Sequence, residues 1–97
     1  MTATSAKNTD TWYLYLIKNK LNQLYTGITK DAERRFQEHA SGSPKCAKAL
    51  KGKGPLVLAF VTKLGDHSTA LKAEIWMKKQ SRDTKNKIIS GEKQIPF

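Results

Sequence analysis

Two short apolar segments separated by a polar turn constrain the fold of this chain more than any other feature. Residues 12–17 (WYLYLI) and 23–28 (QLYTGI) flank the turn sequence NKLN. Segments of this length and composition favour β-strands, and such a turn joins them into a hairpin. Because side chains alternate along a strand, we expect Tyr15 to lie directly opposite Tyr25, with both rings on one face. The other face then carries Leu14, Leu16, Leu24 and Ile28.

A charged helix is predicted directly after the second strand. Thr29 or Asp31 can act as its N-cap, and the helix is expected to end near residue 40, before the sequence SGSP. Three side chains spaced four residues apart form its expected core-facing stripe: Ala32, Phe36 and Ala40. A short helix over residues 45–51 is expected to follow.

The second half of the chain predicts one strand and two helices. Residues 56–62 (LVLAFVT) form a continuous apolar run, which favours the central strand of the sheet, covered on both faces. A helix is expected over about 69–80, and Ser81 is the expected N-cap of a last helix that reaches Ile89. The inward side chains of the first of these helices are expected to be Ala70, Leu71, Ile75, Trp76 and Met77. His67, in the loop before it, is interpreted as a capping-region residue without function.

The predicted order is strand, strand, helix, short helix, strand, helix, helix. It describes an α+β domain, with a small three-stranded antiparallel sheet flanked by helices. A chain of 97 residues holds one hydrophobic core. We therefore expect a flexible lead over residues 1–11, one domain over 12–90 and a C-terminal tail over 91–97.

Charge and cysteine content restrict the partners of the chain. It contains 18 Lys and Arg against 8 Asp and Glu, and the net charge of +10 favours a polyanion such as nucleic acid. No apolar run approaches the roughly 20 residues needed to cross a membrane, so no membrane partner is expected. Cys46 is the only cysteine. It excludes an intramolecular disulfide and fits a cytoplasmic location.

Four groups of residues resemble the signature of the GIY-YIG nuclease superfamily, in particular its small single-domain branch. They are Tyr13-Leu14-Tyr15 at the first tripeptide, Tyr25-Thr26-Gly27 at the second, Glu33-Arg34-Arg35-Phe36 with His39 on the following helix, and Glu74 in LKAEIWMKK. The resemblance covers Trp12 to about Ile89. It implies a metal-dependent endonuclease that cleaves phosphodiester bonds in DNA and selects structure rather than sequence, as the DNA-repair members do.

The chain departs from the family pattern at several positions. The first tripeptide has Tyr-Leu in place of Gly-Ile, and the second has Thr in place of the middle Ile. Larger relatives carry an asparagine after the metal-binding glutamate, for which Asn86 is the only candidate here. These departures spare the signature tyrosines and bear on activity more than on fold.

Phosphodiester hydrolysis needs an activated water, a cation and stabilisation of developing charge. The resemblance assigns water activation to Tyr15 and the holding of a water or phosphate oxygen to Tyr25. A tyrosine with an ordinary pKa near 10 is a poor base at neutral pH, so this role requires a positive charge such as Arg35 or the metal to lower the pKa. Arg35 would also clamp the scissile phosphate, and His39 would orient a water or donate to the leaving group. Glu74 would bind one divalent cation, Mg²⁺ or Mn²⁺.

Two basic clusters have a spacing that suits contacts to a phosphate backbone. The first contains Lys45, Lys48, Lys51 and Lys53, and the second contains Lys78, Lys79, Arg82, Lys85 and Lys87. On the residues alone, a solvated face stays open as the alternative for each cluster, and a packed cross-strand aromatic pair is favoured for the two tyrosines.

Three functions therefore stay open. The first is a nuclease acting on nucleic acid, with DNA favoured over RNA. The second is a nucleic-acid-binding module that has lost turnover, and the third is a protein-interaction domain whose basic face docks an acidic partner. A domain this small is also compatible with a homodimer or a partner protein that selects the substrate.

Overall fold

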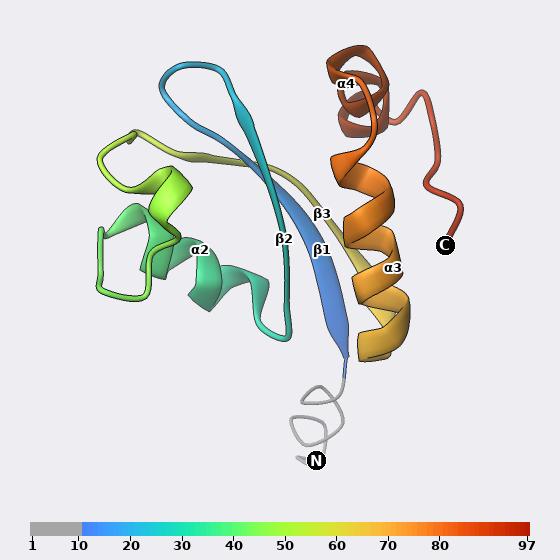
Figure 1. Ribbon diagram of the computed structural model, residues 1–97, viewed down its shortest axis with the longest axis horizontal. Coiled ribbons are helices and arrows are strands. Elements are labelled where there is room, and N and C mark those ends of the chain that lie inside the picture. Colours follow the sequence, from blue (N-terminus) through green and yellow to red (C-terminus); the bar gives the residue numbers. More distant parts are fainter. Residues whose placement is uncertain (1–10) are drawn as a thin grey trace.

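The predicted order of elements is confirmed in the computed structural model, which describes residues 11–97 (Figure 1). Residues 1–10 of the expected N-terminal lead lie outside the described part. The elements are β1 (Trp12–Lys18), β2 (Leu24–Thr29), α2 (Ala32–Ala40), a short 3-10 helix (Lys48–Leu50), β3 (Val57–Gly65), α3 (His67–Lys78) and α4 (Arg82–Ser90). The fold is α+β, with a three-stranded antiparallel sheet.

The central strand of the sheet is β1, so the expectation that residues 56–62 form it is wrong. The strand order is β2-β1-β3, which puts β3 at an edge. Leu14, Leu16 and Ile17 of β1 are fully buried, whereas Val57 and Val61 of β3 are 54% and 43% exposed. An uninterrupted apolar run has no period of two, and therefore does not by itself distinguish a central strand from an edge strand.

The register of the hairpin differs by two residues from the one predicted. Tyr15 pairs with Gly27, and Ile17 rather than Tyr15 pairs with Tyr25. The connecting turn is longer than expected because the side-chain Oδ1 of Asn19 accepts hydrogen bonds from the backbone N–H groups of Leu21 and Gln23. A shift of two preserves the side-chain alternation. Both tyrosines therefore share one face as predicted, although they are not direct cross-strand partners.

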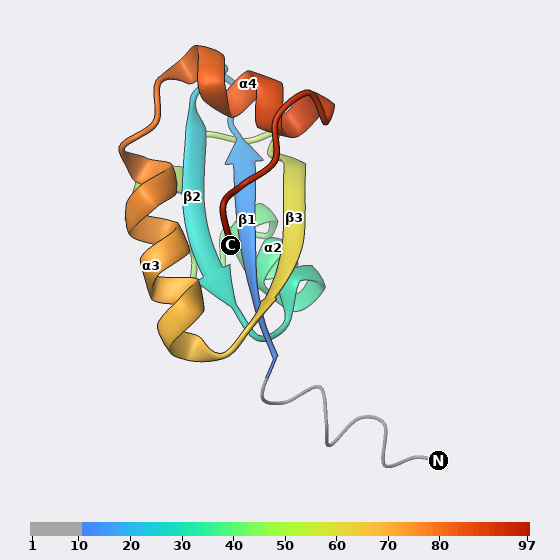
Figure 2. The ribbon, with the colours of Figure 1, turned by 90° about the vertical axis from the view of Figure 1, so that its right-hand side faces the viewer.

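Both faces of β1 are covered by apolar side chains. On one face Leu14 and Leu16 pack with residues of α3 and α4: Ala73, Met77 and Ile88. On the other face Tyr15 and Ile17 pack with Cys46 and Leu50, beneath α2 and the segment that follows it. Figure 2 shows this layering, with α3 and α4 in front of the sheet and α2 behind it. The sheet therefore separates two clusters, and the tyrosine face belongs to the smaller one.

Asp31 and Ser81 are the N-caps of α2 and α4, as the sequence predicted. α3 begins at His67, two residues before the predicted start, with Asp66 as its N-cap. Each of the three side chains accepts a backbone N–H of the first turn. α4 ends at Gly91, whose φ of 88° is the left-handed conformation that glycine adopts without strain. The short helix expected over 45–51 is reduced to one 3-10 turn.

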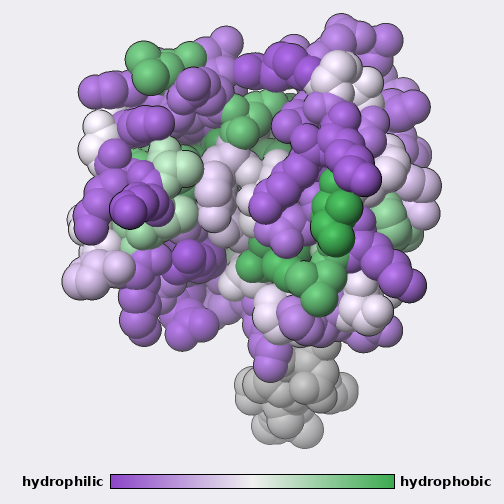
Figure 3. Space-filling view, in the orientation of Figure 1, coloured by the Kyte–Doolittle hydropathy of each residue, from purple (hydrophilic) through white to green (hydrophobic). Residues whose placement is uncertain are grey.

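Two predictions of helix burial are wrong. In α3 the buried side chains are Ala70, Ala73 and Met77, while Leu71 and Ile75 are 41% and 56% exposed. Small alanines let the helix approach the sheet closely, so the larger residues on the neighbouring stripe turn outward. On the face shown in Figure 3, hydrophobic side chains gather over α3 within a mostly hydrophilic surface.

In α2 the expected inward residue Ala40 is exposed, and the buried position belongs instead to His39. His39 is only 2% exposed. A prediction based on the apolar stripe of a helix places histidine on the outward face. His39 is buried instead, because both of its ring nitrogens have hydrogen-bond partners.

Residues 91–97 form no helix or strand, but they contact the domain. Ile95 packs against the cluster beneath α3 and α4, and the Phe97 ring meets the edge of the Trp76 ring at a centroid distance of 6.1 Å. Within residues 11–97, no helix combines the length and apolar character that crossing a membrane requires.

Candidate active site

The side chain of Tyr15 occupies space that any residue other than glycine would fill at position 27. A Cβ built on Gly27 would lie 2.3 Å from the Tyr15 hydroxyl oxygen and 2.4 Å from its Cζ. Tyr15 is 3% exposed, so its ring has little freedom to move aside. The glycine of the second tripeptide therefore allows the first-tripeptide tyrosine to lie across β2, the edge strand next to α3.

His39 holds the hydroxyl of Tyr15 through one ring nitrogen and the chain beyond α2 through the other. Its Nε2 lies 3.2 Å from the Tyr15 hydroxyl, and its Nδ1 accepts the backbone N–H of Ala47 at 3.1 Å. A backbone N–H only donates, so Nδ1 is unprotonated and the proton of the neutral ring resides on Nε2. The His39 Nε2–H therefore donates to the Tyr15 hydroxyl oxygen.

The protonation of His39 is restricted by the same contacts. Burial, followed by the positive charge of Arg35, lowers the pKa of the imidazole below its ordinary value of 6.5. Protonation of Nδ1 would also break the hydrogen bond from Ala47. His39 is thus neutral at pH 7 and suited to positioning Tyr15 rather than to carrying a proton to the leaving group.

The pKa of Tyr15 is raised to about 12, first by burial and then by the neighbouring Tyr25. Arg35 acts in the opposite direction, as a hydrogen-bond donor and a positive charge, but it does not overcome burial. Arg35 alone therefore does not provide the lowered pKa that a base role requires. In the resting protein Tyr15 is a neutral hydroxyl whose own proton is free to point toward a ligand.

Tyr25 completes an aromatic triangle with Tyr15 and His39. Its ring centroid lies 6.3 Å from that of Tyr15 and 5.7 Å from that of His39, the latter in an edge-on arrangement. These are favourable aromatic geometries. The three predicted residues are thus brought together: Tyr15 from β1, Tyr25 from β2 and His39 from α2.

Arg35 lies one turn before His39 on α2 and joins this group. Its Nη1 donates to Glu38 Oε1 at 2.9 Å and to the carbonyl of Lys45 at 2.7 Å. A guanidinium has five N–H donors, and these two contacts occupy only Nη1. The side chain is 28% exposed. Arg35 is therefore held in a fixed orientation and still accessible to an anionic ligand.

Glu74 approaches the same region from α3, which packs along β2. Its side chain is 21% exposed and its Oε2 lies 3.5 Å from Lys78 Nζ. The negative charge of Glu74 is the smallest of the effects that shift the pKa of Tyr15, and it raises that pKa.

The residues around Tyr15 fit a divalent metal that is held by a single protein carboxylate. The described residues contain no group of three or more His, Cys, Asp or Glu side chains arranged to hold a metal. Mg²⁺ keeps several waters and often uses one or two carboxylates plus substrate phosphates. Glu74 alone suits such a site, and a closed site built from protein ligands does not.

The predicted basic clusters occupy two ends of the molecule. Lys45, Lys48 and Lys51 are exposed around the 3-10 helix, and Lys53 is half-buried. In the second cluster several side chains have partners: Lys78 pairs with Glu74, Lys87 pairs with Asp83, and Arg82 donates to the carbonyl and Oδ1 of Asn22. Asn86 lies on α4, where its Oδ1 accepts from Arg82 Nε at 3.0 Å.

Two contributors to the site were missed in the sequence. The backbone N–H of Ala47 fixes the His39 ring, and no residue pattern signals a main-chain contact across eight residues. Tyr13 was named only as the first residue of the tripeptide. It lies two residues before Tyr15 on the same face of β1 and lines a neighbouring cavity, and the period of two could have indicated this position.

Comparison with known proteins agrees with this architecture. The model of the family described as "GIY-YIG catalytic domain" matches residues 11–88. The chain therefore belongs to the GIY-YIG family, a class of nuclease domains that act on nucleic acids and generally depend on a metal ion.

The chain is similar to proteins named UPF0213. It is 53% identical over 79 residues to the UPF0213 protein YhbQ of Escherichia coli O8 (strain IAI1), a match that covers 81% of this chain and 77% of the relative. A protein of the same name from Shigella boydii serotype 18 is 52% identical over the same shares. The solution NMR structure of the UPF0213 protein BH0048 from Bacillus halodurans matches with a TM-score of 0.54 and 34% identity, covering 84% of this chain and 85% of that one.

Proposed function

We propose that this protein is a metal-dependent endonuclease that hydrolyses phosphodiester bonds in DNA, selects its substrates by structure and acts in DNA repair. The observation that carries the proposal is the buried hydrogen bond between Tyr15 and His39, with Arg35 and Glu74 in the same environment. Any buried tyrosine hydroxyl needs a hydrogen-bond partner, so the proposal depends on the guanidinium and the carboxylate that also act on this hydroxyl.

The residues divide the chemistry among them. Glu74 would hold the cation, which when bound would polarise the phosphate and lower the pKa of water. Arg35 binds a non-bridging phosphate oxygen through the donors that Glu38 and Lys45 leave free. Tyr25 donates to a water or a phosphate oxygen. These contacts bring the phosphate next to the Tyr15 hydroxyl.

Tyr15 would first release its own proton to solvent and then accept the proton of the attacking water, while the leaving oxygen would take a proton back from solvent. The Nε2–H of His39 and the charge of Arg35 stabilise the tyrosinate. His39 stays neutral throughout because its Nδ1 is committed to Ala47. The pKa of about 12 keeps Tyr15 protonated in the resting protein, so loss of its proton is the event that a bound cation and Arg35 would have to favour.

The proposal favours DNA over RNA, with Mg²⁺ or Mn²⁺ as the cation. The exposed lysines of the first cluster and Lys79 of the second bind the phosphate backbone on either side of the site. We also propose a cytoplasmic location, in keeping with the single free thiol of Cys46, and substrate selection aided by a homodimer or a partner protein.

Cleavage of labelled single-stranded, duplex and branched DNA and RNA tests the proposal, with Mg²⁺, with Mn²⁺ and with a chelator. We expect metal-dependent cutting of at least one DNA structure. The alternative is a binding module of the same fold, which the raised pKa of Tyr15 favours. Salt-sensitive binding without cutting under any metal condition would replace the first function by this one.

A further inference from the structure

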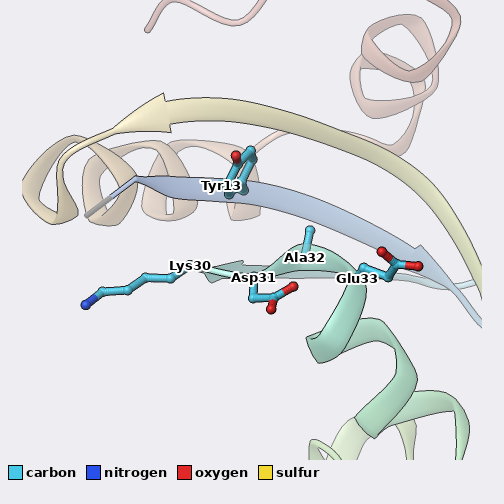
Figure 4. Close-up of a pocket in the computed structure, with 5 residues that line it drawn as sticks. All are labelled: Tyr13, Lys30, Asp31, Ala32 and Glu33. Carbon is cyan, nitrogen blue, oxygen red and sulfur yellow. The ribbon is translucent and has the colours of Figure 1, made fainter. Parts of the chain in front are cut away.

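A cavity next to the candidate active site is not used by the chemistry described above. It has a volume of about 370 Å³ and is lined by Tyr13 of β1 and by the junction between β2 and α2: Lys30, Asp31, Ala32 and Glu33. This volume lies at the lower end of the range of about 300–1,000 Å³ typical of small-molecule sites. Figure 4 shows Lys30 extending to one side, Glu33 to the other, and Asp31 and Ala32 between them.

The position of the cavity relates it to Tyr15. Tyr13 and Tyr15 are two residues apart on one face of β1, which corresponds to a separation of about 7 Å. That distance is comparable with the step between neighbouring phosphates of one strand. A nucleic acid whose phosphate lies at Tyr15 therefore brings an adjacent nucleotide to Tyr13.

The lining chemistry suits a base better than a phosphate. Asp31 and Glu33 are both exposed. The Asp31 carboxylate accepts the Arg34 backbone N–H at 3.1 Å and lies 3.8 Å from Arg34 Nε, which leaves it lone pairs for a further donor. The two carboxylates repel a phosphate and can accept hydrogen bonds from exocyclic amino groups. Tyr13 supplies an aromatic wall on which a base can stack. Lys30 also lines the cavity, with its Nζ 5.6 Å from the Trp12 ring centroid, and the exposed Lys63 is the cross-strand partner of Tyr13.

We propose that this cavity is a subsite for one unpaired base next to the scissile phosphate, stacked on Tyr13 and read through its amino group by Asp31 and Glu33. The subsite rests on the proposed nuclease function. It prefers cytosine and adenine to thymine, which has no exocyclic amino group. A paired base cannot enter it, because stacking on Tyr13 requires the base to leave its own stack.

The test is equilibrium binding of short fluorescent oligodeoxynucleotides of cytosine, adenine or thymine, measured with a chelator present so that no cleavage occurs. We expect the cytosine and adenine oligomers to bind about fivefold or more tightly than thymine, the discrimination that one good base contact provides. Asp31→Asn combined with Glu33→Gln should bring this ratio close to one. Asn remains a good N-cap, so α2 is retained.

Variants of Tyr13 test the stacking wall. Tyr13→Val should weaken binding of all three oligomers about tenfold, within the range known for base–aromatic stacking, while Tyr13→Phe should bind like the wild type. Val57→Thr, an exposed position at the far end of β3, is the matched control and should have no effect. Equal binding of the three oligomers, or unchanged binding by Tyr13→Val, would overturn the subsite.

The same protein tested for cleavage separates the two proposals. A base preference that depends on Tyr13, without cutting under any metal condition, supports the subsite and overturns the nuclease function. Metal-dependent cutting without base preference supports the nuclease function and overturns the subsite.

Discussion

The phenol ring of Tyr15 lies over the backbone of Gly27, its cross-strand partner. The two signature tripeptides are therefore in contact where the tyrosine side chain fills the space left by the glycine. The contact also directs the Tyr15 hydroxyl to His39. The glycine is therefore needed for space rather than for an unusual backbone conformation, and this explains why a strand interior tolerates it.

Gly27→Ala is expected to displace Tyr15 and to abolish cleavage, because the added Cβ would lie 2.3 Å from the hydroxyl oxygen. The free energy of unfolding should fall by about 1–3 kcal/mol, as for other overpacked interiors. Gly54→Ala is the matched control, since the nearest atom to its Cβ is 3.9 Å away. Unchanged cleavage by Gly27→Ala would show that the ring position does not matter.

The lowered pKa of the buried His39 leads us to expect a loss of stability in mild acid. Its pKa is lowered in the folded state, so the unfolded chain takes up a proton near pH 6.5 while the folded protein does not. The free energy of unfolding should therefore decrease as the pH falls below about 6.5. Thermal unfolding across this range checks the effect, and in His39→Gln the corresponding slope should be absent. A wild-type stability independent of pH between 7 and about 5 would contradict the buried neutral ring.

Tyr15 should ionise at unusually high pH in metal-free protein. Its pKa of about 12 lies above the ordinary value of 10.0 because the ring is buried. Tyrosinate absorbance during an alkaline titration should contain one late phase, and Tyr15→Phe should remove it. Since the unfolded chain releases this proton first, stability should fall as the pH rises above about 10. A late phase that persists in Tyr15→Phe would assign the raised pKa to another residue.

Arg82 is predicted to act mainly on stability, although its position in a basic cluster suggested a role in nucleic-acid binding. Its guanidinium donates to both oxygens of Asn22 in the hairpin turn and to Asn86 on α4. Arg82→Ala should lower the free energy of unfolding by about 1–2 kcal/mol. Lys79→Ala, at an exposed neighbouring position, should leave stability unchanged and reduce the salt dependence of DNA binding. Equal free energies of unfolding for the two variants would show that the Arg82 hydrogen bonds do not stabilise the fold.

Local signals predicted the order of the elements, the N-caps of α2 and α4 and the common face of the two tyrosines, because side-chain alternation and N-cap chemistry act within a few residues. The register was wrong because the Asn19 side chain lengthens the turn. The prediction that β3 is the central strand was wrong, because strand order depends on which edge of the hairpin the third strand joins. The exposed Leu71 and Ile75 show the same limit: alanines decide which stripe of α3 approaches the sheet.

The candidate site also has features that the sequence predicted and features that it did not. The order of the signature residues indicated which side chains to examine, and the structure brings Tyr15, Tyr25 and His39 together. The tautomer of His39 and the direction of the Tyr15 pKa shift depend on a main-chain donor and on burial. Neither is encoded in any short stretch of sequence.

The most direct test of the account is single-turnover cleavage of the best DNA substrate by wild type, Glu74→Gln and Tyr15→Phe, with DNA binding measured in parallel. The account predicts Mg²⁺- or Mn²⁺-dependent cutting by the wild type. Each variant should lose at least about a hundredfold in rate while binding stays nearly unchanged. Wild-type rates in either variant, or no cutting by the wild type on any structure, would contradict it.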